Sequence, residues 1–389
     1  MIFPGPDLTS AEPRPTALFS ACASVSAANK WTAINGWSVS LVYTNVTEEY
    51  NALTRRAAVA DFGMLWRYIV RGPDAPDYLA RVTSAPLRNL ELGESARGLM
   101  LTSVGTVVDL IDVARLGDDL YLLTCSRAHP RRLQLAARGF DATIEDITGR
   151  VAALAIIGPD AHDVAAVAGL KVDSENLAAQ ATVRGVETAA RPINVGVQPG
   201  VEIIYPYEEA LTLWERVRRA AAPTPCGLDA LEVLRIEAGA PRLGVDFIGA
   251  DESEEASETE RSPQALGLPH LAPVNRAWFN GRRSLSSASE PIEKVLTVLA
   301  LDSDELNVGS AVFANGEPIG HITSAAFSPR LKRAIAFAEI SQVATNMAYE
   351  VGPLGNLGKR VSAKVFDTAE SELSQAFQAS LREATESRR

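Results

Sequence analysis

The chain has 389 residues and a formal net charge of −11, and 47% of its residues are hydrophobic. This composition is typical of a globular protein that is long enough for two or three domains with their own cores. The acidic balance argues against nucleic-acid binding, which depends on clustered Lys and Arg. We therefore expect no nucleic-acid partner.

The cysteines and histidines are few and dispersed. Cys22, Cys125 and Cys226 form no CxxC pair, which predicts reduced thiols and neither a disulfide framework nor a zinc site. No two histidines have the i, i+4 spacing of a helical metal pair, so we expect no metal. No apolar run reaches the roughly 18 residues that cross a bilayer, and the acidic start does not resemble a signal peptide. We expect a cytoplasmic protein with no membrane partner. The sequence does not indicate its oligomeric state.

In chain order, residues 1–44 form an N-terminal lead-in, which we expect to be irregular over residues 1–40. A helix is predicted from Thr47, a good N-cap residue. Residues 67–72 are then predicted as a strand, and Asp74 is expected to cap the helix that follows. The pattern indicates mixed helix and strand content from the beginning.

The phrase Gly-Pro-Asp-Ala occurs twice, at Gly72 and at Gly158, each time between a strand-like and a helix-like segment. This suggests a pseudo-repeat of β-α units and not the short period of a solenoid. Further predicted strands are 105–114 and 119–125, and residues 191–207 are predicted as strand–turn–strand. Predicted helices then cover 208–220 and a segment that ends near Gly239.

The last third of the chain changes character. Residues 251–260 are an acidic run, which we interpret as a solvated loop. Beyond Pro291 short strands alternate with turns, and Asn315-Gly316 predicts a two-residue hairpin. A charged helical tail is expected from Thr368. Pattern alone therefore predicts an α+β protein with a β-barrel appendage.

The sequence lacks a P-loop, a GxGxxG fingerprint and a GxSxG elbow. Instead, seven phrases resemble those of the glycine-cleavage aminomethyltransferase (T-protein) superfamily, in order and at comparable spacing. They are Glu49–Gly63, Gly72–Ala75, Gly105–Asp109, Gly200–Ile203, Leu234–Gly239, Phe279–Arg282 and Ile319–Lys332.

The resemblance implies an α+β fold, a three-domain cloverleaf with a C-terminal β-barrel domain. On this basis residues 45–285 are the folate-binding region of two interleaved α+β domains. Residues 286–367 are then the barrel domain, and residues 368–389 the helical tail. The cofactor implied is tetrahydrofolate.

The resemblance also implies site residues. Glu202 matches the family glutamate that binds the pterin, whose two-donor edge suits one carboxylate. Asp109 matches a family aspartate implicated in folate-dependent catalysis and folate binding, and Tyr121 is a candidate for lining the cofactor pocket. From pattern alone the alternatives are a surface strand glutamate at 202, an exposed strand aspartate at 109 and an aromatic core residue at 121.

Two departures from the family pattern concern the reaction. Residues 194–200 replace the phrase that precedes the pterin glutamate in aminomethyltransferases, and Leu231-Glu232 replaces an Arg-Asp pair. The phrase Pro199–Ile203 resembles the tetrahydrofolate-dependent demethylase branch instead. We therefore expect a one-carbon (methyl) transferase that demethylates a small O-, N- or S-methyl compound to give 5-methyltetrahydrofolate. The alternatives are an aminomethyltransferase of glycine cleavage and a non-catalytic folate-binding protein.

Overall fold

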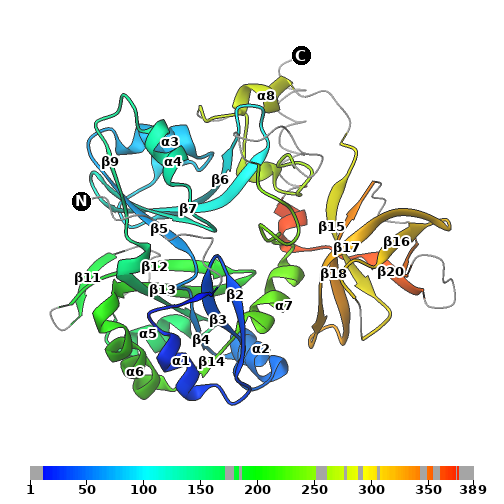
Figure 1. Cartoon of the computed structure of the whole chain (residues 1–389), viewed down its shortest axis with the longest axis horizontal. Coiled ribbons are helices and arrows are strands. Elements are labelled where there is room, and N and C mark those ends of the chain that lie inside the picture. The colour runs from blue at the N-terminus through cyan, green and yellow to red at the C-terminus, as the bar shows by residue number, and fades with distance from the viewer. Residues whose placement is uncertain are drawn as a thin grey trace. The chain divides into compact units, whose positions relative to one another are not determined.

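The structure of the protein is a computed structural model (Figure 1). It describes residues 12–170, 179–183, 186–250, 261–275, 278–287, 292–304, 307–341, 348–353, 360–373 and 375. The chain forms two compact units. Unit 1 comprises residues 1–98 and 110–231, and unit 2 comprises residues 99–109 and 232–389.

Unit 1 begins with a small sheet of strand order β1-β3-β2. Its strands are β1 (Arg14–Pro15), β2 (Lys30–Ile34) and β3 (Trp37–Val42), and helix α1 (Phe19–Val25) lies between the first two in sequence. The expectation of an irregular segment over residues 1–40 is therefore wrong from Arg14 onward. The cause is a second Asn-Gly turn: Asn35 and Gly36 have φ angles of 53° and 78° and join β2 to β3 as a hairpin.

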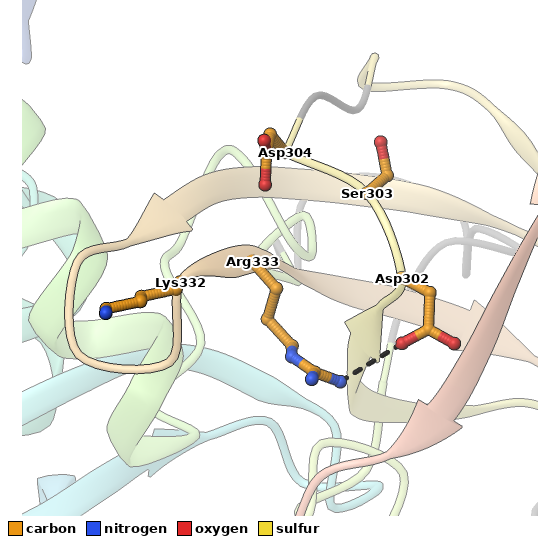
Figure 2. Close-up of a pocket in the computed structure, with 5 residues that line it drawn as sticks. All are labelled: Asp302, Ser303, Asp304, Lys332 and Arg333. Atoms are coloured by element: carbon orange, nitrogen blue, oxygen red, sulfur yellow. Dashed lines mark hydrogen bonds and ion pairs between the residues drawn. The ribbon is translucent and has the colours of Figure 1, made fainter.

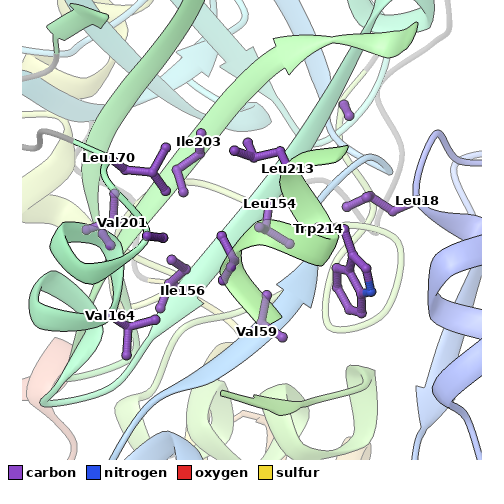
Figure 3. Close-up of a cluster of buried hydrophobic side chains, with 14 of the residues drawn as sticks. Leu18, Val59, Leu154, Ile156, Val164, Leu170, Val201, Ile203, Leu213 and Trp214 are labelled. Atoms are coloured by element: carbon purple, nitrogen blue, oxygen red, sulfur yellow. The ribbon is translucent and has the colours of Figure 1, made fainter. Parts of the chain in front are cut away.

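A six-stranded sheet of order β11-β12-β13-β10-β4-β14 forms the centre of unit 1 (Figure 1). Its strands are β4 (Ala58–Asp61), β10 (Val151–Ile157), β11 (Ala179–Val183), β12 (Val186–Val195), β13 (Gln198–Pro206) and β14 (Thr224–Pro225). Helices α5 (Ala161–Val167) and α6 (Ala210–Ala221) pack on one face of this sheet. Figure 3 shows the apolar core beneath them, where Leu154, Ile203 and Trp214 meet.

The second large sheet is five-stranded, in the order β6-β7-β8-β5-β9. Its strands are β5 (Trp66–Arg71), β6 (Ser95–Leu101), β7 (Val107–Gly117), β8 (Leu120–Cys125) and β9 (Thr143–Asp146), and β6 and β7 continue from one unit into the other. Helices α3 (Ala75–Val82) and α4 (Pro130–Ala136) contact each other beside it. Apolar residues of both large sheets, among them Ala114, Leu122 and Ile204, form one buried cluster, so the sheets face each other.

Two predicted helix caps differ from the structure. Helix α2 (Val46–Arg55) is capped by Asn45, whose side chain accepts a hydrogen bond from Glu48 N, and Thr47 lies inside the first turn. Asp74 precedes α3 but makes no side-chain cap; its Oδ2 accepts from Asp141 N at 2.8 Å. Both helices are therefore present as predicted, but the predicted capping hydrogen bonds of Thr47 and Asp74 are not formed.

Unit 2 holds a closed barrel of order β15-β18-β17-β16-β19-β20. Its strands are β15 (Val295–Leu301), β16 (Ala311–Ala314), β17 (Glu317–Ser328), β18 (Arg333–Ile340), β19 (Tyr349–Gly352) and β20 (Val361–Val365). The predicted Asn315-Gly316 hairpin is confirmed: both residues have positive φ and join β16 to β17. A polar pocket of about 250 Å³ at the barrel is lined by Asp302, Ser303, Asp304, Lys332 and Arg333. Figure 2 shows these residues, with the ion pair between Arg333 and Asp302.

Helix α7 (Leu228–Ala238) contains all but the last residue of the Leu234–Gly239 phrase, and this phrase belongs to unit 2. Arg235 donates to Asp246 Oδ2 at 2.6 Å, and Asp246 Oδ1 accepts from the hydroxyls of Thr323 and Ser324 in β17. Glu237 accepts a hydrogen bond from Ser328 Oγ at the end of the same strand. The phrase therefore fastens the helix to the barrel.

The remaining short elements are η1 (Leu87–Asn89), η2 (Thr148–Arg150), η3 (Tyr207–Glu209), η4 (Pro269–Leu271) and α8 (Arg282–Ser287). Among the described residues no helix is long and apolar enough to cross a membrane. The acidic run 251–260 and most of the predicted tail from Thr368 lie outside the described residues.

Candidate functional site

Glu202 lies in the middle of β13 and is completely buried, with a side-chain exposure of 0%. Its Oε1 accepts a hydrogen bond from Arg67 Nη2 at 2.5 Å, and its Oε2 accepts from Arg191 Nε at 2.5 Å. Both arginine side chains are buried as well, at 1% and 6% exposure. The interpretation of Glu202 as a surface strand residue is therefore wrong.

Strand geometry explains how the three charges meet. Val201 and Ile203 point into the core under α5 and α6, so the alternation of a strand directs Glu202 to the opposite face, toward the five-stranded sheet. Arg191 is the direct cross-strand partner of Glu202 in the β12–β13 hairpin. Arg67 approaches from β5, where its guanidinium also donates to the carbonyls of Leu65 and Phe62.

The electrostatics keep Glu202 and Arg191 charged. Burial raises the pKa of Glu202, but Arg191 and Arg67 outweigh it and hold that pKa at about 2. Burial lowers the pKa of Arg191, whereas Glu202 and then Asp112 raise it, with a net upward shift. A buried carboxylate between two guanidinium groups is thus fully ionised at neutral pH.

A second ion pair lies close enough to act on this cluster. Arg97 in β6 donates from Nε to Oδ1 of Asp112 in β7, at 3.2 Å, and both side chains are partly exposed. The two residues are among the charges that shift the pKa of Arg191. We name Arg67, Arg191, Glu202, Arg97 and Asp112, all of unit 1, the arginine cluster.

Asp109 lies in β7 and belongs to unit 2, whereas Glu202 belongs to unit 1. Its exposure is 0%, so the interpretation as an exposed strand aspartate is wrong. Because strand side chains alternate, Asp109 and Asp112 lie on opposite faces of β7. The catalytic and folate-binding roles of Asp109 stay predictions.

Tyr121 lies in β8 opposite Val70 and Arg115 and is only 3% exposed. Burial raises the pKa of its phenol, and the nearby Arg115 opposes that shift. Among the described residues no hydrogen bond joins it to Glu202, and its environment agrees with the aromatic core alternative. The cofactor-binding role of Tyr121 stays a prediction.

Sequence reasoning missed the partners of Glu202 and one further buried acid. Asp61, at the end of β4, accepts from Thr16 Oγ1 at 2.5 Å and from Gly63 N at 2.8 Å. Burial raises its pKa, while these hydrogen bonds and Arg67 oppose the shift. The strand–turn–strand predicted over residues 191–207 has its turn at Gly196-Val197, and this places residue 191 opposite residue 202. This register is the one sequence signal for the pairing of Arg191 with Glu202.

The described residues contain no group of three or more His, Cys, Asp or Glu side chains that could hold a metal ion. The arginine cluster contains groups that can bind a ligand through hydrogen bonds. A carboxylate oxygen accepts more than one hydrogen bond, and guanidinium groups present several N–H donors in a plane.

Comparison with known families agrees with the fold just described. The GCVT N-terminal domain matches residues 22–257, and the glycine cleavage T-protein C-terminal barrel domain matches residues 294–369. The first of these matches covers more than half of the chain. The protein belongs to the glycine-cleavage T-protein (GCVT) family.

The individual relatives share less than a third of the aligned residues with this chain. An aminomethyltransferase of Thermotoga maritima is 26% identical over 341 residues, which are 85% of this chain and 90% of the relative. One of Geobacillus thermodenitrificans is 29% identical over 360 residues, 87% of this chain and 93% of the relative. The crystal structure of the glycine cleavage system aminomethyltransferase T from Bartonella henselae superimposes with a TM-score of 0.80 at 22% identity. It covers 92% of this chain and 98% of that one, and the likeness confirms the fold.

Proposed function

We propose that the protein is a tetrahydrofolate-dependent one-carbon transferase. The observation that carries this proposal is the match of both family domains, which together span residues 22–369. The named relatives are aminomethyltransferases and align over most of their length with this chain. The pterin glutamate of the family corresponds to Glu202, which lies at the centre of the arginine cluster.

The residues of the cluster fit a pterin in their donor and acceptor chemistry. Each oxygen of Glu202 accepts one hydrogen bond from an arginine and has a second lone pair for the two-donor edge of the ring. The carboxylate is, however, 0% exposed. A ligand edge therefore reaches Glu202 only when Arg67 or Arg191 moves aside.

For the reaction itself we propose demethylation of a small O-, N- or S-methyl compound. Bound tetrahydrofolate would supply N5 as the methyl acceptor, and the bond from the methyl carbon to the heteroatom would break. An ether oxygen or an amine nitrogen would leave with the N5 proton, whereas a sulfonium sulfur would leave as a neutral thioether and the N5 proton would pass to solvent. The role of the protein is to orient the two reactants and keep out water. The support for this reaction is the Pro199–Ile203 phrase and the loss of the Arg-Asp pair at Leu231-Glu232.

Aminomethyl transfer in glycine cleavage is the second candidate, favoured by the names of the relatives. One experiment separates the two. The protein is incubated with tetrahydrofolate and methoxyaromatic, methylamine or methylsulfonium donors, and 5-methyltetrahydrofolate is measured. We expect this product from at least one donor class. Formation of methylenetetrahydrofolate from an aminomethyl-lipoyl donor alone would assign the protein to the second candidate instead.

Glu202→Ala and Glu215→Ala serve as a matched pair in this assay. Glu215 is a half-exposed helix residue in a surface ion pair, so its removal leaves the site intact. We expect product formation to be lost in the first variant and retained in the second. Equal activity of the two variants would overturn the assignment of Glu202, though not the reaction class.

A further inference from the structure

The two arginines that bind Glu202 are held in place by different numbers of contacts. Arg67 donates to Glu202 and also to two carbonyls of the loop between β4 and β5. Asp61 is a further carboxylate that acts electrostatically on Arg67. In the described part of the chain Arg191 donates a side-chain hydrogen bond only to Glu202, through Nε. Arg191 is therefore the easier of the two to displace from the carboxylate.

Strand register places a second carboxylate in the same layer between the two sheets. Asp112 in β7 is the cross-strand partner of Thr124 in β8, and Thr124 is the partner of Arg67 in β5. Ala114 and Leu122, each two residues away on the same strands, lie in the apolar cluster between the sheets. Because strand side chains alternate, Asp112, Thr124 and Arg67 form a row that points into this space.

Asp112 can accept a further guanidinium. Asp112 and Arg191 are close enough for the carboxylate to raise the pKa of the arginine. Oδ1 of Asp112 accepts from Arg97 at 3.2 Å, and among the described residues Oδ2 accepts no side-chain hydrogen bond. One carboxylate can bind two arginines, as Glu202 does. The Asp112 side chain is 27% exposed, so a guanidinium loses less hydration there than beside the fully buried Glu202.

The observed arrangement also leaves a buried hydroxyl unused. Thr124 Oγ1 is buried and has no hydrogen-bond partner among the described residues. An unpaired buried polar atom is unfavourable, and a hydroxyl can accept a hydrogen bond from a guanidinium. Because Thr124 is the cross-strand neighbour of Asp112, a guanidinium that binds Asp112 lies beside this hydroxyl.

We propose that Asp112 is a positioning residue, which receives the guanidinium of Arg191 when a ligand takes the place of Arg191 on Glu202. Arg67 stays in position and orients the glutamate for the ligand. The inference rests on the proposed function in taking that ligand to be the two-donor edge of a pterin. The exchange of partners does not rest on it, because it follows whenever Glu202 ceases to hold Arg191.

The first test needs no folate. Glu202→Gln removes the negative charge that holds Arg191, so Arg191 pairs with Asp112 in the ligand-free protein. Asp112→Asn is introduced into wild type and into Glu202→Gln, and the thermal midpoints form a double-mutant cycle. We expect the midpoint to fall by about 2 °C or less in wild type and by about 4 °C or more in Glu202→Gln.

Asp302→Asn is the matched control for this cycle. Asp302 forms a partly exposed ion pair with Arg333, also at 3.2 Å, and lies in the other unit. Its effect on the midpoint should be the same in wild type and in Glu202→Gln. If the effects of Asp112→Asn and Glu202→Gln are equally independent of each other, the proposed exchange is wrong.

The second test measures the effect of the exchange on the ligand. Tetrahydrofolate is titrated into the full chain and followed by fluorescence. We expect Asp112→Asn to weaken binding by about tenfold, because the displaced Arg191 then has no carboxylate to receive it. Asp302→Asn should leave the affinity unchanged.

Arg191→Met distinguishes the exchange from direct contact between Asp112 and the ligand. A methionine need not be transferred to a carboxylate, so Asp112→Asn should no longer weaken binding in the Arg191→Met background. The same loss of about tenfold in both backgrounds would overturn the proposal.

The two proposals fail in different ways. A wild-type protein that binds no tetrahydrofolate contradicts the proposed function, and the midpoints of the ligand-free variants still decide whether Arg191 moves to Asp112. Tetrahydrofolate binding together with additive midpoint changes contradicts the exchange alone.

Discussion

Arg67 and Glu202 lie 135 positions apart in sequence and form a buried ion pair between two sheets, with Nη2 at 2.5 Å from Oε1. Arg67 comes from β5 of the five-stranded sheet and Glu202 from β13 of the six-stranded sheet. A charged contact in this position is costly to form and more costly to break, because either partner left alone is a buried, uncompensated charge. The pair therefore has consequences for stability that can be measured.

Replacement of Arg67 by Met removes the charge and keeps much of the side-chain volume. We expect the free energy of unfolding to fall by about 3–5 kcal/mol, as is usual when one partner of a buried pair is lost. Urea denaturation followed by circular dichroism measures the change. Arg219→Met breaks an exposed i, i+4 pair with Glu215 and is the control, with an expected loss below about 1 kcal/mol. Similar losses in the two variants would contradict the buried pairing.

The depressed pKa of Glu202 predicts a stability loss in acid. Arg191 and Arg67 outweigh burial and hold its folded-state pKa at about 2, below the ordinary value of 4.5. A depressed carboxyl pKa gives stability that is complete above the unfolded-state pKa and is lost as pH falls through the folded-state pKa. Because a tenfold change in an equilibrium constant corresponds to about 1.4 kcal/mol, we expect the free energy of unfolding to drop by about 3 kcal/mol between about pH 5 and pH 2.

The measurement is a series of urea titrations at pH values from about 2 to 6 on wild type and Glu202→Gln. The glutamine cannot titrate, so the difference between the two proteins should shrink steadily as the pH falls below the ordinary carboxyl pKa of 4.5. Other carboxylates titrate in both proteins and cancel in this difference. A difference that stays constant with pH would mean that Glu202 has no depressed pKa.

Folate affinity should depend on the same carboxylate. If Glu202 accepts the pterin edge, Glu202→Gln replaces one acceptor oxygen by an amide donor and should weaken tetrahydrofolate binding by about tenfold or more, which corresponds to about 1.4 kcal/mol. Fluorescence titration with tetrahydrofolate measures it, with Glu215→Gln as the control. Undiminished affinity in Glu202→Gln would remove Glu202 from the binding site.

Much of the fold could be predicted because its signals are local. The strands before Gly72 and Gly158 and the helices after them follow from apolar patterning and the repeated Gly-Pro-Asp-Ala phrase, and the Asn315-Gly316 hairpin follows from its turn residues. Asn35-Gly36 carries the same signal, but the Ser- and Ala-rich composition around it favours an irregular segment.

The site was less predictable because its partners are distant in sequence. Glu202 was identified by resemblance, and hairpin register places Arg191 opposite it. The pairing of Arg67 with Glu202 depends on how two sheets face each other, which no local pattern encodes. The burial of Asp109 has the same origin: a strand pattern alone does not tell which face of β7 is covered.

The barrel offers a prediction about close packing. Gly320, in the resemblance phrase Ile319–Lys332, has no positive φ, but a Cβ there would lie 1.9 Å from the carbonyl oxygen of Glu339 on the paired strand β18. Because the obstacle is backbone, Gly320→Ala must push β17 and β18 apart, and we expect a loss of about 1–3 kcal/mol or more. Gly149→Ala meets no atom within 4 Å and is the control, with no loss expected. Thermal unfolding of both variants tests this, and a Gly320→Ala protein as stable as Gly149→Ala would show that the two strands are not in this register.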